Sequence, residues 1–458
     1  MINYPLEITY IIASILFIMG LKGLGHPESA RRGMHYAEIG MLMAVVGTLL
    51  GQNIVTWQWI LIGLVIGSAI GTAMAIFMPM TAMPQRIAIS HAFGALAAVL
   101  VGINEFVVKG SEITSGLMGA LGFEVLFGSL TVTGSLMAFG KLQGVLRSEP
   151  MTYKGQNFVN ISLFFVIVGM FVYLVFFPQN ALVFGSMIAL SFLIGIFIVM
   201  PIGGADMPVV LSLMNSYAGL AAAATGFAIN NKVLIIAGSL DGSSGFILSI
   251  IMSKAMNRSF ANVLFGAVGS KPVDTSTLHE DRPITKINVE DAKFILEQAD
   301  RVVVVPGYGM AVAQAQHAVR ELSDELEKRG TKVEFAIHPV AGRMPGHMNV
   351  LLAEANVSYD QLQEMEVINP TMDTVDVAIV IGANDVVNPA ARTDKGSPIY
   401  GMPIIDVDKA RTVIVMKRSM ATGFAGIENP LFYQENTKML FGDAKNVLQQ
   451  LIAEFKKT

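Results

Sequence analysis

Residues 302–312 read Val-Val-Val-Val-Pro-Gly-Tyr-Gly-Met-Ala-Val. The run of valines predicts a buried β-strand, and the glycines after it predict a turn that opens a helix. In that geometry the backbone N–H groups at a helix N-terminus can hold a pyrophosphate. The stretch therefore indicates a nucleotide site, although a glycine motif alone is weak evidence and this one ends in Val312, where the common form has Gly or Ala.

Composition changes sharply along the chain. The 458 residues are 53% hydrophobic and only 14% charged, which is outside the usual soluble range. Residues 1–260 hold 11 of the 31 Lys and Arg residues and 9 of the 35 Asp and Glu residues, so most of the charge follows residue 260. We therefore expect a membrane domain at 1–260, a polar linker at 261–288 and a nucleotide-binding domain at 289–458.

Several classes of function are excluded or disfavoured. The chain has no cysteine, which excludes disulfides, thiolate catalysis, Fe–S clusters and Cys-ligated zinc. The N-terminus lacks the basic region of a cleaved signal peptide. We expect no metal site and no nucleic-acid partner.

The first 260 residues contain apolar segments of the length that a bilayer core requires, about 20 residues each. We count nine, near 5–22, 36–52, 57–78, 87–108, 117–138, 158–177, 181–200, 208–229 and 233–253. With the N-terminus outside, the cytoplasmic segments carry nine cations: Lys22, Arg31, Arg32, Arg86, Lys141, Arg147, Lys154, Lys254 and Arg258. The external loops carry only Lys109 and Lys232. The positive-inside rule favours this orientation and places the C-terminal domain in the cytoplasm.

Ionisable residues inside the predicted spans are functional candidates, because each is costly in a membrane unless paired or hydrated. His91 can take and release a proton near neutral pH, or can simply be satisfied by a neighbouring hydroxyl or carbonyl. Glu124 is either part of a polar path or a helix-packing partner. Asp241 either pairs across the bundle or marks a broken helix. Asn215 adds a hydrogen-bonding group, so the set suits a proton path completed by water.

One short loop between predicted spans also carries an acid. Residues 200–208 read Met-Pro-Ile-Gly-Gly-Ala-Asp-Met-Pro and are cytoplasmic in this topology. Asp206 then either faces the soluble domain or is an N-cap acid in a plain turn.

The soluble part alternates strands and helices. We predict helices at 292–299, 311–328, 348–355 and 445–456, and strands at 301–306, 332–338, 374–381 and 412–417. This order is typical of a doubly wound parallel sheet, a Rossmann-like α/β domain whose ligands bind at the carboxyl ends of the strands. The fold class is therefore a polytopic helical membrane bundle followed by such a domain.

The residues at the strand ends favour a phosphorylated ribose. Where an ordinary NAD site has an acid for the ribose 2′-OH, this chain has His338-Pro339. Lys417, Arg418 and Ser419 follow a late strand and fit a monophosphate by charge and donor count. The alternative is a solvated cationic strand end.

Three more glycine-bearing loops follow predicted strands, at 339–347, 381–385 and 422–426. The first brings Arg343, the second brings Asn384 and Asp385, and the third has the flexibility of a lid. Each alone is more often structural than functional, but all are predicted to meet at one sheet edge.

Together these residues resemble the β subunit of the proton-translocating nicotinamide nucleotide transhydrogenases. The resemblance spans almost the whole chain and is carried by Pro201–Pro208, Asn215-Ser216-Tyr217, Lys254-Ala255-Met256-Asn257-Arg258-Ser259, Gly307–Val312, Val340–His347, Gly382–Asp385, Lys417–Ser419 and Leu440-Phe441-Gly442-Asp443-Ala444-Lys445.

The resemblance implies an enzyme that passes a hydride between NADH and NADP⁺ while protons cross the membrane. It implies that this chain holds NADP(H), in an orientation inverted relative to ordinary dinucleotide folds. An α subunit holds NAD(H) and supplies further membrane helices. We expect a dimer of αβ units in the cell inner membrane. Such hydride transfer needs no protein nucleophile, because the cofactors carry the chemistry.

The resemblance also assigns residues. The membrane histidine and asparagine fall on His91 and Asn215, the acid facing the nucleotide domain on Asp206, and the acid beside the nicotinamide on Asp385. The remaining cofactor-binding positions are Gly307, Tyr308, Gly309, Met310, Ala311, Val312, Gly342, Arg343, Met344, Pro345, Gly346, Gly382, Ala383, Asn384, Lys417, Arg418, Ser419, Gly423, Phe424, Ala425, Gly426, Asp443 and Ala444. The lid of the family usually carries Tyr where this chain has Phe424, which keeps ring stacking but loses a hydroxyl hydrogen bond.

Two other functions fit some of the same features. One is a transporter or channel gated by a cytosolic nucleotide-binding regulatory domain. The other is a passive NADP-binding membrane anchor. The missing acid after the second strand, the basic triplet and the absence of a discernible substrate cavity argue against the transporter.

Overall fold

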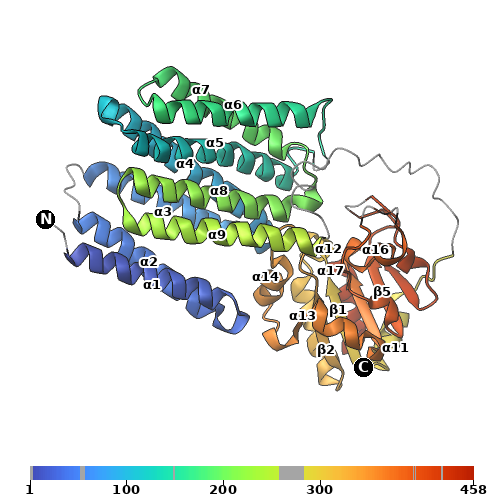
Figure 1. Ribbon diagram of the computed structural model, residues 1–458. Helices are drawn as coiled ribbons and strands as arrows, with labels where there is room; N and C mark the ends of the chain where they lie inside the picture. Colours follow the sequence, from blue (N-terminus) through green and yellow to red (C-terminus); the bar gives the residue numbers. More distant parts are fainter. Residues whose placement is uncertain are drawn as a thin grey trace. The chain divides into compact units, whose positions relative to one another are not determined.

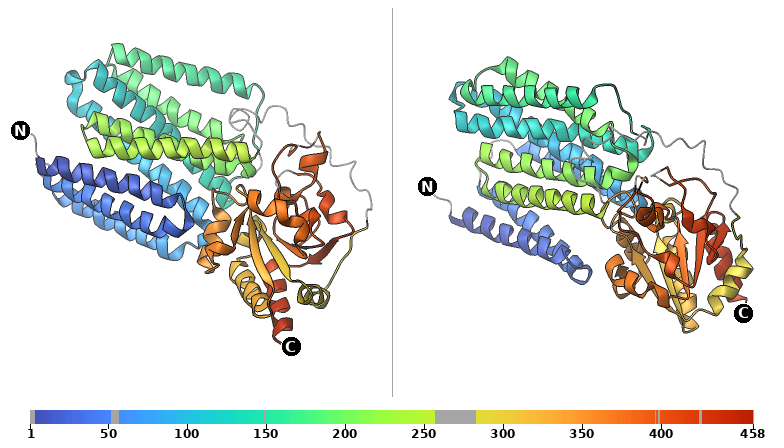
Figure 2. Two further views of the ribbon diagram at one scale, coloured as in Figure 1. Left: turned by 60° about the horizontal axis from the view of Figure 1, so that its bottom comes forward. Right: turned by 45° about the vertical axis from the view of Figure 1, so that its right-hand side comes forward.

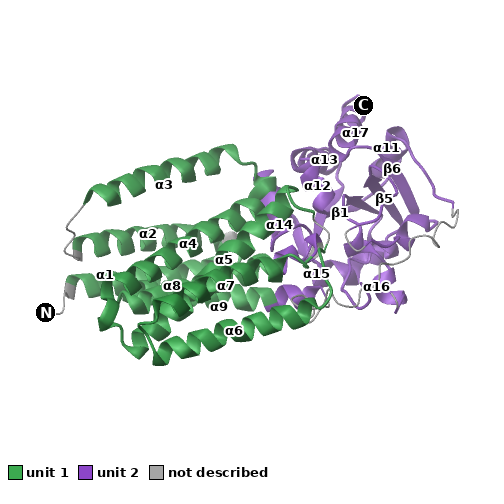
Figure 3. Cartoon of the chain, turned by 90° about the horizontal axis from the view of Figure 1, so that it is seen from above, with its two compact units in different colours: residues 1–202, 210–249 green, residues 203–209, 250–458 purple. Residues whose placement is uncertain are grey.

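The computed structural model describes residues 4–51, 57–147, 150–256, 283–395, 397, 399–423 and 426–457. The chain divides into two compact units, one of residues 1–202 and 210–249 and the other of residues 203–209 and 250–458 (Figure 3). Most of the expected linker and two lid residues, Phe424 and Ala425, lie outside the described residues.

The first unit is helical (Figure 1). Its helices are α1 (Tyr4–Leu24), α2 (Pro27–Gly51), α3 (Trp57–Phe77), α4 (Met83–Lys109), α5 (Ser115–Gln143), α6 (Gln156–Phe176) and α7 (Ala181–Val199), together with most of α8 (Met207–Ala228) and of α9 (Lys232–Ala255). Within the described ranges, nine helices are long and apolar enough to span a membrane, as the sequence predicts. α2 begins well before the predicted residue 36, because hydropathy detects only the apolar part of a helix whose first turns are polar.

Close helix contacts depend on small residues. A Cβ atom on Gly219 of α8 would lie 2.3 Å from the backbone nitrogen of Gly242 on α9, so these two backbones touch. By contrast, α3 has no buried residue, and its exposed apolar surface is the kind that lipid or partner helices cover.

The second unit contains a six-stranded sheet (Figure 2). Its strands are β1 (Arg301–Pro306), β2 (Lys332–Ile337), β3 (Leu362–Glu364), β4 (Val377–Ile381), β5 (Thr412–Lys417) and β6 (Thr437–Phe441). All five pairings are parallel and the order is β3-β2-β1-β4-β5-β6, the arrangement of a doubly wound dinucleotide fold. In the register, Val304 lies opposite Phe335 of β2 and Ile379 of β4.

Strand alternation distributes the core over both faces of the sheet. Val303 and Val305 of β1 belong to one cluster with Ala378 and Val380 of β4, so Val302 and Val304 point to the other face. Helix α17 (Ala444–Lys456) packs on both α11 (Val289–Glu297) and α13 (Gln316–Lys328). Residues 302–305 of β1 are all buried, so both faces of the sheet are covered, as a parallel sheet requires.

The sequence-based elements need three corrections. β3 and β6 were not predicted, because β3 is a three-residue edge strand and β6 has a weak apolar pattern. The single helix predicted at 311–328 is two helices, α12 (Tyr308–Val312) and α13, separated by Gln314 with a left-handed φ of 49°. β4 begins at Val377 rather than at 374, because residues 369–374 form a 3₁₀ turn.

Three short helices complete the unit. α14 (His347–Glu354) follows the loop after β2, and α15 (Met365–Ile368) follows β3. α16 (Ala390–Thr393) follows the loop after β4.

Candidate functional site

The loops that follow the parallel strands all lie along the carboxyl edge of the sheet. A cavity there is lined by residues from four of these loops and from the segment after α16, namely Gly307, Tyr308, Gly309, Val340, Ala341, Gly342, Gly382, Ala383, Asn384, Asp385, Val386, Ile399, Met402, Thr422 and Gly423. The predicted convergence of glycine-bearing loops is thus present in the fold.

The glycines after β1 make room for the neighbouring loop. Gly309 donates its N–H to the carbonyl of Gly382 at 2.9 Å. A Cβ on Gly307 would lie 2.4 Å from the Gly382 oxygen, and Gly382 itself has a left-handed φ of 65°. The loops after β1 and β4 therefore touch at the point where the strand order reverses, the place where doubly wound folds bind their ligands.

The loop after β2 is organised by a neutral histidine. His347, fully buried at the start of α14, accepts the Arg343 N–H through Nδ1 at 3.1 Å. Burial, and then the nearby charge of Arg343, lower the pKa of His347 to about 4. The Arg343 guanidinium carbon lies 4.3 Å from the centre of the Tyr308 ring, a cation–π contact. This contact joins the loop after β2 to the glycine turn after β1.

His338, in the position of the missing acid, is also buried and neutral. Its Nε2 lies 2.7 Å from the Pro403 carbonyl, and its Nδ1 accepts the Val340 N–H at 3.2 Å. Burial lowers the pKa of His338 to about 4, although the Pro403 hydrogen bond acts in the opposite direction. The side chain therefore holds the surrounding loops in place.

Asn384 and Asp385 lie under the start of the predicted lid. A Cβ on Gly423 would lie 2.6 Å from Asp385 Oδ1 and 2.8 Å from Asn384 Nδ2, so only glycine fits there without a shift. Buried Asn429 donates through Nδ2 to both the backbone and side-chain oxygens of Asn384, at 3.1 Å each. Buried Asn388 donates to the Glu428 carbonyl at 3.0 Å. These two asparagines, which sequence reasoning missed, fasten the chain after the lid to the loop after β4.

The basic triplet after β5 separates into two parts. Lys417 is half-buried, donates to the Ala421 carbonyl at 2.7 Å and lies 4.5 Å above the Phe432 ring. Arg418 and Ser419 are exposed. The exposed pair presents a guanidinium and a hydroxyl suited to a phosphate, and the Lys417 ammonium, which can add a third donor, also supports the turn below the pair.

The remaining predicted cofactor-binding residues differ in whether their side chains are exposed and in what they do locally. Met310, Ala311 and Met344 have buried side chains, so they can contact a ligand only through the backbone. Asp443 caps α17 by accepting the Asn446 N–H at 3.3 Å, and the buried Ala444 begins that helix. Val312 is exposed, Gly346 and Gly426 have left-handed φ values, and Pro345 lies in the turn before α14.

A further wall of the cavity comes from the strap, which we define as residues 394–406. Its side chains Ile399 and Met402 line the cavity and pack with Ala391 and Ile404. The local sequence pattern does not identify them, because the described residues of the strap have no regular secondary structure.

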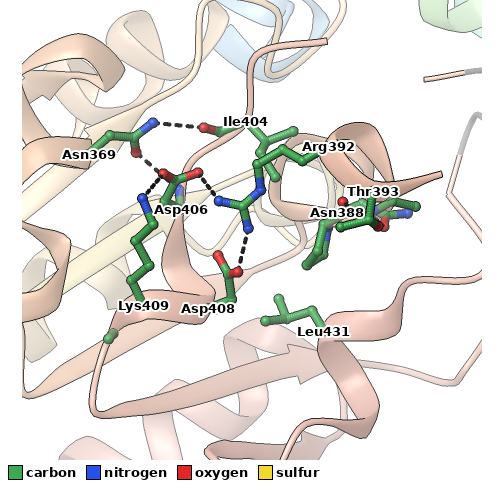
Figure 4. Close-up of polar contacts among 12 residues, drawn as sticks. Asn369, Asn388, Arg392, Thr393, Ile404, Asp406, Asp408, Lys409 and Leu431 are labelled. Carbon is green, nitrogen blue, oxygen red and sulfur yellow. Dashed lines mark hydrogen bonds and ion pairs between the residues drawn. The ribbon is translucent and has the colours of Figure 1, made fainter. Parts of the chain in front are cut away.

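The strap is anchored by an ion-pair network (Figure 4). Arg392 of α16 pairs with Asp406 at 2.7 Å and also with Asp408. Lys409 binds the second oxygen of Asp406 at 2.7 Å. Asn369 donates to the Ile404 carbonyl at 2.8 Å and accepts the Asp406 N–H at 3.0 Å. These contacts fix the carboxyl-terminal end of the strap, at Ile404 and Asp406, to α16 and to Asn369.

In the first unit, the predicted membrane polar residues form two groups. His91 of α4 interacts with the side chain of Asn215 on α8. Asn215 in turn donates through Nδ2 to Asp241 Oδ1 on α9 at 3.0 Å. α9 runs unbroken from Lys232 to Ala255, so of the two alternatives for Asp241, pairing across the bundle is correct and a broken helix is wrong.

Glu124 belongs to the second group. It is fully buried on α5, and the Thr225 hydroxyl of α8 lies 2.7 Å from its Oε1. A Cβ on Gly102 of α4 would lie 3.2 Å from the Glu124 carboxyl carbon. Glu124 therefore packs between three helices.

Asp206, the loop acid, ends the 3₁₀ turn Gly204–Asp206 immediately before α8.

Together, the parallel sheet with its glycine cavity and the long apolar helices define a multi-pass membrane protein with a dinucleotide-binding domain. The model of the family described as "NAD(P) transhydrogenase beta subunit" matches residues 6–454. The chain is 50% identical over 452 residues to two curated proteins named "NAD(P) transhydrogenase subunit beta", both from Rhodospirillum rubrum, and the match covers 97% of this chain and 97% of each relative. The chain belongs to the NAD(P) transhydrogenase beta subunit family.

Membership makes the chain part of an oxidoreductase that uses nicotinamide nucleotides, with an α subunit as its partner. The alternative of a gated transporter or channel finds no support in these comparisons.

Proposed function

We propose that this chain is the NADP(H)-holding, proton-translocating subunit of a transhydrogenase of the Re/Si-specific, translocase type. The observation that carries the proposal is the joint occurrence of two features in one chain. One is a glycine cavity at the carboxyl edge of the sheet, where the exposed Arg418 and Ser419 also follow β5, and the other is a histidine-centred polar group within membrane helices.

The carboxyl-edge cavity fits NADP(H) in particular. Its lining glycines let the loops after β1 and β4 contact each other through the backbone, and the backbone N–H groups of such a turn suit a pyrophosphate. No acid stands where NAD sites bind the ribose 2′-OH, since His338 is buried and tied to Pro403. Arg418, Ser419 and Lys417 would hold the 2′-phosphate, and Asp385 would lie beside the nicotinamide under the lid.

The bound cofactor supplies the hydride chemistry. The chain's own residues position it and exclude water: Ile399 and Met402 form an apolar wall, and Gly423 lets the lid approach Asp385 closely. NAD(H) would be bound by the α subunit, so the active site is completed only in the αβ complex. We infer a dimer of αβ units.

The membrane part would carry the proton. His91 and Asn215 form the proton site, and Asp206, at the start of α8, links it to the nucleotide domain. The functional division is then a proton-translocating domain at 1–260, a linker at 261–288 and an NADP(H)-binding domain at 289–458. The protein would lie in the cell inner membrane with its N-terminus outside and the nucleotide domain in the cytoplasm.

The test uses vesicles that contain both subunits. Reduction of a thio-analogue of NADP⁺ by NADH is measured with and without a proton gradient, together with proton uptake. In His91→Ala we expect proton-linked turnover to fall at least 100-fold while NADPH still binds. His35→Ala, which removes an exposed histidine paired with Glu38 on α2, is the matched control and should behave as wild type. Normal proton pumping in His91→Ala rules out the assignment.

A passive NADP-binding anchor is separated by the same experiment. NADPH binding without thio-NADP⁺ reduction, in vesicles that contain the α subunit, would favour the anchor. Reduction that responds to the proton gradient would exclude it.

A further inference from the structure

The contact between α8 and α9 places an acid beside the proposed proton site. Gly219 and Gly242 bring the two backbones together, and Ser216 Oγ donates to the Gly242 carbonyl at 2.7 Å. Asp241 precedes Gly242, so its carboxylate is held at the surface of α8. There Asn215 Nδ2 donates to its Oδ1 at 3.0 Å.

The side-chain amide of Asn215 has a nitrogen that donates hydrogen bonds and an oxygen that accepts them, and the two atoms serve different partners. Because the nitrogen of Asn215 donates to Asp241, its oxygen is left to accept a hydrogen bond. The His91 imidazole interacts with this same side chain. The order is therefore imidazole, amide, carboxylate, across α4, α8 and α9.

The charges of His91 and Asp241 determine whether this arrangement is stable inside a membrane segment. A lone imidazolium or a lone carboxylate inside a membrane segment is costly. A protonated His91 that donates to the Asn215 oxygen, with an ionised Asp241 that accepts from the Asn215 nitrogen, is neutral as a group. Each polarised hydrogen bond strengthens the other.

We propose that Asp241 is the counter-ion of the proton on His91, acting through the amide of Asn215. Asp241 is thus a positioning residue for the proton-transfer step. This inference rests on the proposed function, because it presupposes that His91 carries the proton.

Other ionisable groups on the surrounding helices are committed elsewhere. Arg86 of α4 donates to the Met78 carbonyl, and Lys141 of α5 donates to the carbonyls of Met200 and Ile202. Glu124 of α5 bonds Thr225. Further groups on these elements are Tyr217 of α8, which packs on Phe127, the Glu105–Lys109 ion pair near the end of α4, and Lys232 and Lys254 at the two ends of α9. Asp241 is the carboxylate bonded to Asn215.

Removing the carboxylate should make His91 hold its proton only at lower pH. Two unit charges separated by an amide interact strongly enough to shift a titration by on the order of 1 pH unit at intermediate dielectric. In Asp241→Asn we therefore expect the pH profile of proton-linked thio-NADP⁺ reduction to move to lower pH by about 1 unit. NADPH affinity of the full complex should be unchanged.

Three further variants sharpen the test. Asp241→Glu keeps the charge and should restore the profile most of the way to wild type. Asp241→Ser, a small polar residue like the neighbouring Ser243 and Ser244, should shift the profile as Asp241→Asn does, and serves if the asparagine variant fails to assemble. Ser243→Asn adds an amide next to the site without removing charge and should leave the profile in place.

The outcomes separate the two hypotheses. An unchanged pH profile in an assembled Asp241→Asn or Asp241→Ser complex overturns the counter-ion role, even if His91→Ala abolishes proton-linked turnover. Absence of proton-linked turnover in wild type, or its survival in His91→Ala, overturns the proposed function instead.

Discussion

Lys417 illustrates how burial sets the charge of a side chain at the proposed phosphate site. Burial lowers the pKa of the Lys417 ammonium to about 8, while the carboxylate of Asp385 acts in the opposite direction. The ammonium is therefore protonated below about pH 8 and becomes neutral above it. Arg418, being a guanidinium, keeps its charge throughout this range.

The first prediction concerns NADP(H) affinity and pH. A phosphate prefers the protonated ammonium, so affinity should fall as pH rises through about 8. Lys417→Gln should weaken binding about 10-fold at pH 7 and abolish this pH step. Calorimetric titration of the full chain with NADPH from pH 6.5 to 9 checks it. Lys328→Gln, which removes an exposed lysine on α13, is the control. A pH step that persists in Lys417→Gln would refute the role of this side chain.

At the scale of elements, the carboxyl edge combines loops of two kinds. The glycine turns after β1 and β4 are fixed by backbone contact, such as the hydrogen bond from Gly309 to Gly382. The strap at 394–406 is held by two backbone hydrogen bonds, from Gly401 to the Ala391 carbonyl and from Ile405 to the Val386 carbonyl, and in addition by Arg392 and its carboxylate partners. The position of Ile399 and Met402 in the cavity wall therefore depends in part on an ion-pair network outside the cavity.

A second prediction follows for this network. Arg392→Ala should loosen the strap and lower NADPH affinity about 3- to 10-fold, because the apolar wall is no longer held in place. The melting temperature should change little, because partly exposed ion pairs contribute modestly to stability. Arg411→Ala is a matched control, since it removes an arginine–aspartate pair with Asp376 at the amino ends of the strands. Equal loss of affinity in both variants would contradict the prediction.

The whole second unit has a built-in sensitivity to acid. His338 and His347 are buried and neutral, with pKa values lowered from 6.5 to about 4. Both are more easily protonated in the unfolded chain, so the unfolded state binds more protons between these values. Stability is therefore fully present above about pH 6.5 and is lost as pH falls towards 4, by about 3 kcal/mol for each histidine.

The third prediction tests this sensitivity in the full-length chain. Thermal unfolding of the sheet domain, followed by circular dichroism between pH 7 and 4.5, should show a falling melting temperature. His338→Gln keeps a donor for the Pro403 carbonyl without a titrating ring and should reduce the pH dependence by about half, because His347 still titrates. His317→Gln, which replaces an exposed histidine of α13, should leave the pH dependence as it is. A wild-type melting temperature independent of pH in this range would exclude the effect.

Local patterns predicted much of this fold. Apolar runs of about 20 residues and valine-rich strands depend on neighbours in sequence, so the spans and four strands could be predicted. The Gln314 break, the edge strand β3 and the strap could not, because each is imposed by packing against distant residues. For the same reason the hydrogen bonds that Asn388 and Asn429 make to distant residues could not be predicted from the local sequence.

The sequence by itself determined the class of the two parts, the parallel order of strands and helices, and the residue types at the carboxyl edge. Only the tertiary structure decided that Lys417 lies under its turn while Arg418 is exposed, and that His338 is a buried structural residue. It alone also joined Asn215 to Asp241, because the rotation of α9 about its axis depends on the close backbone contact with α8. Side-chain pairing across elements is a property of packing, which no local pattern encodes.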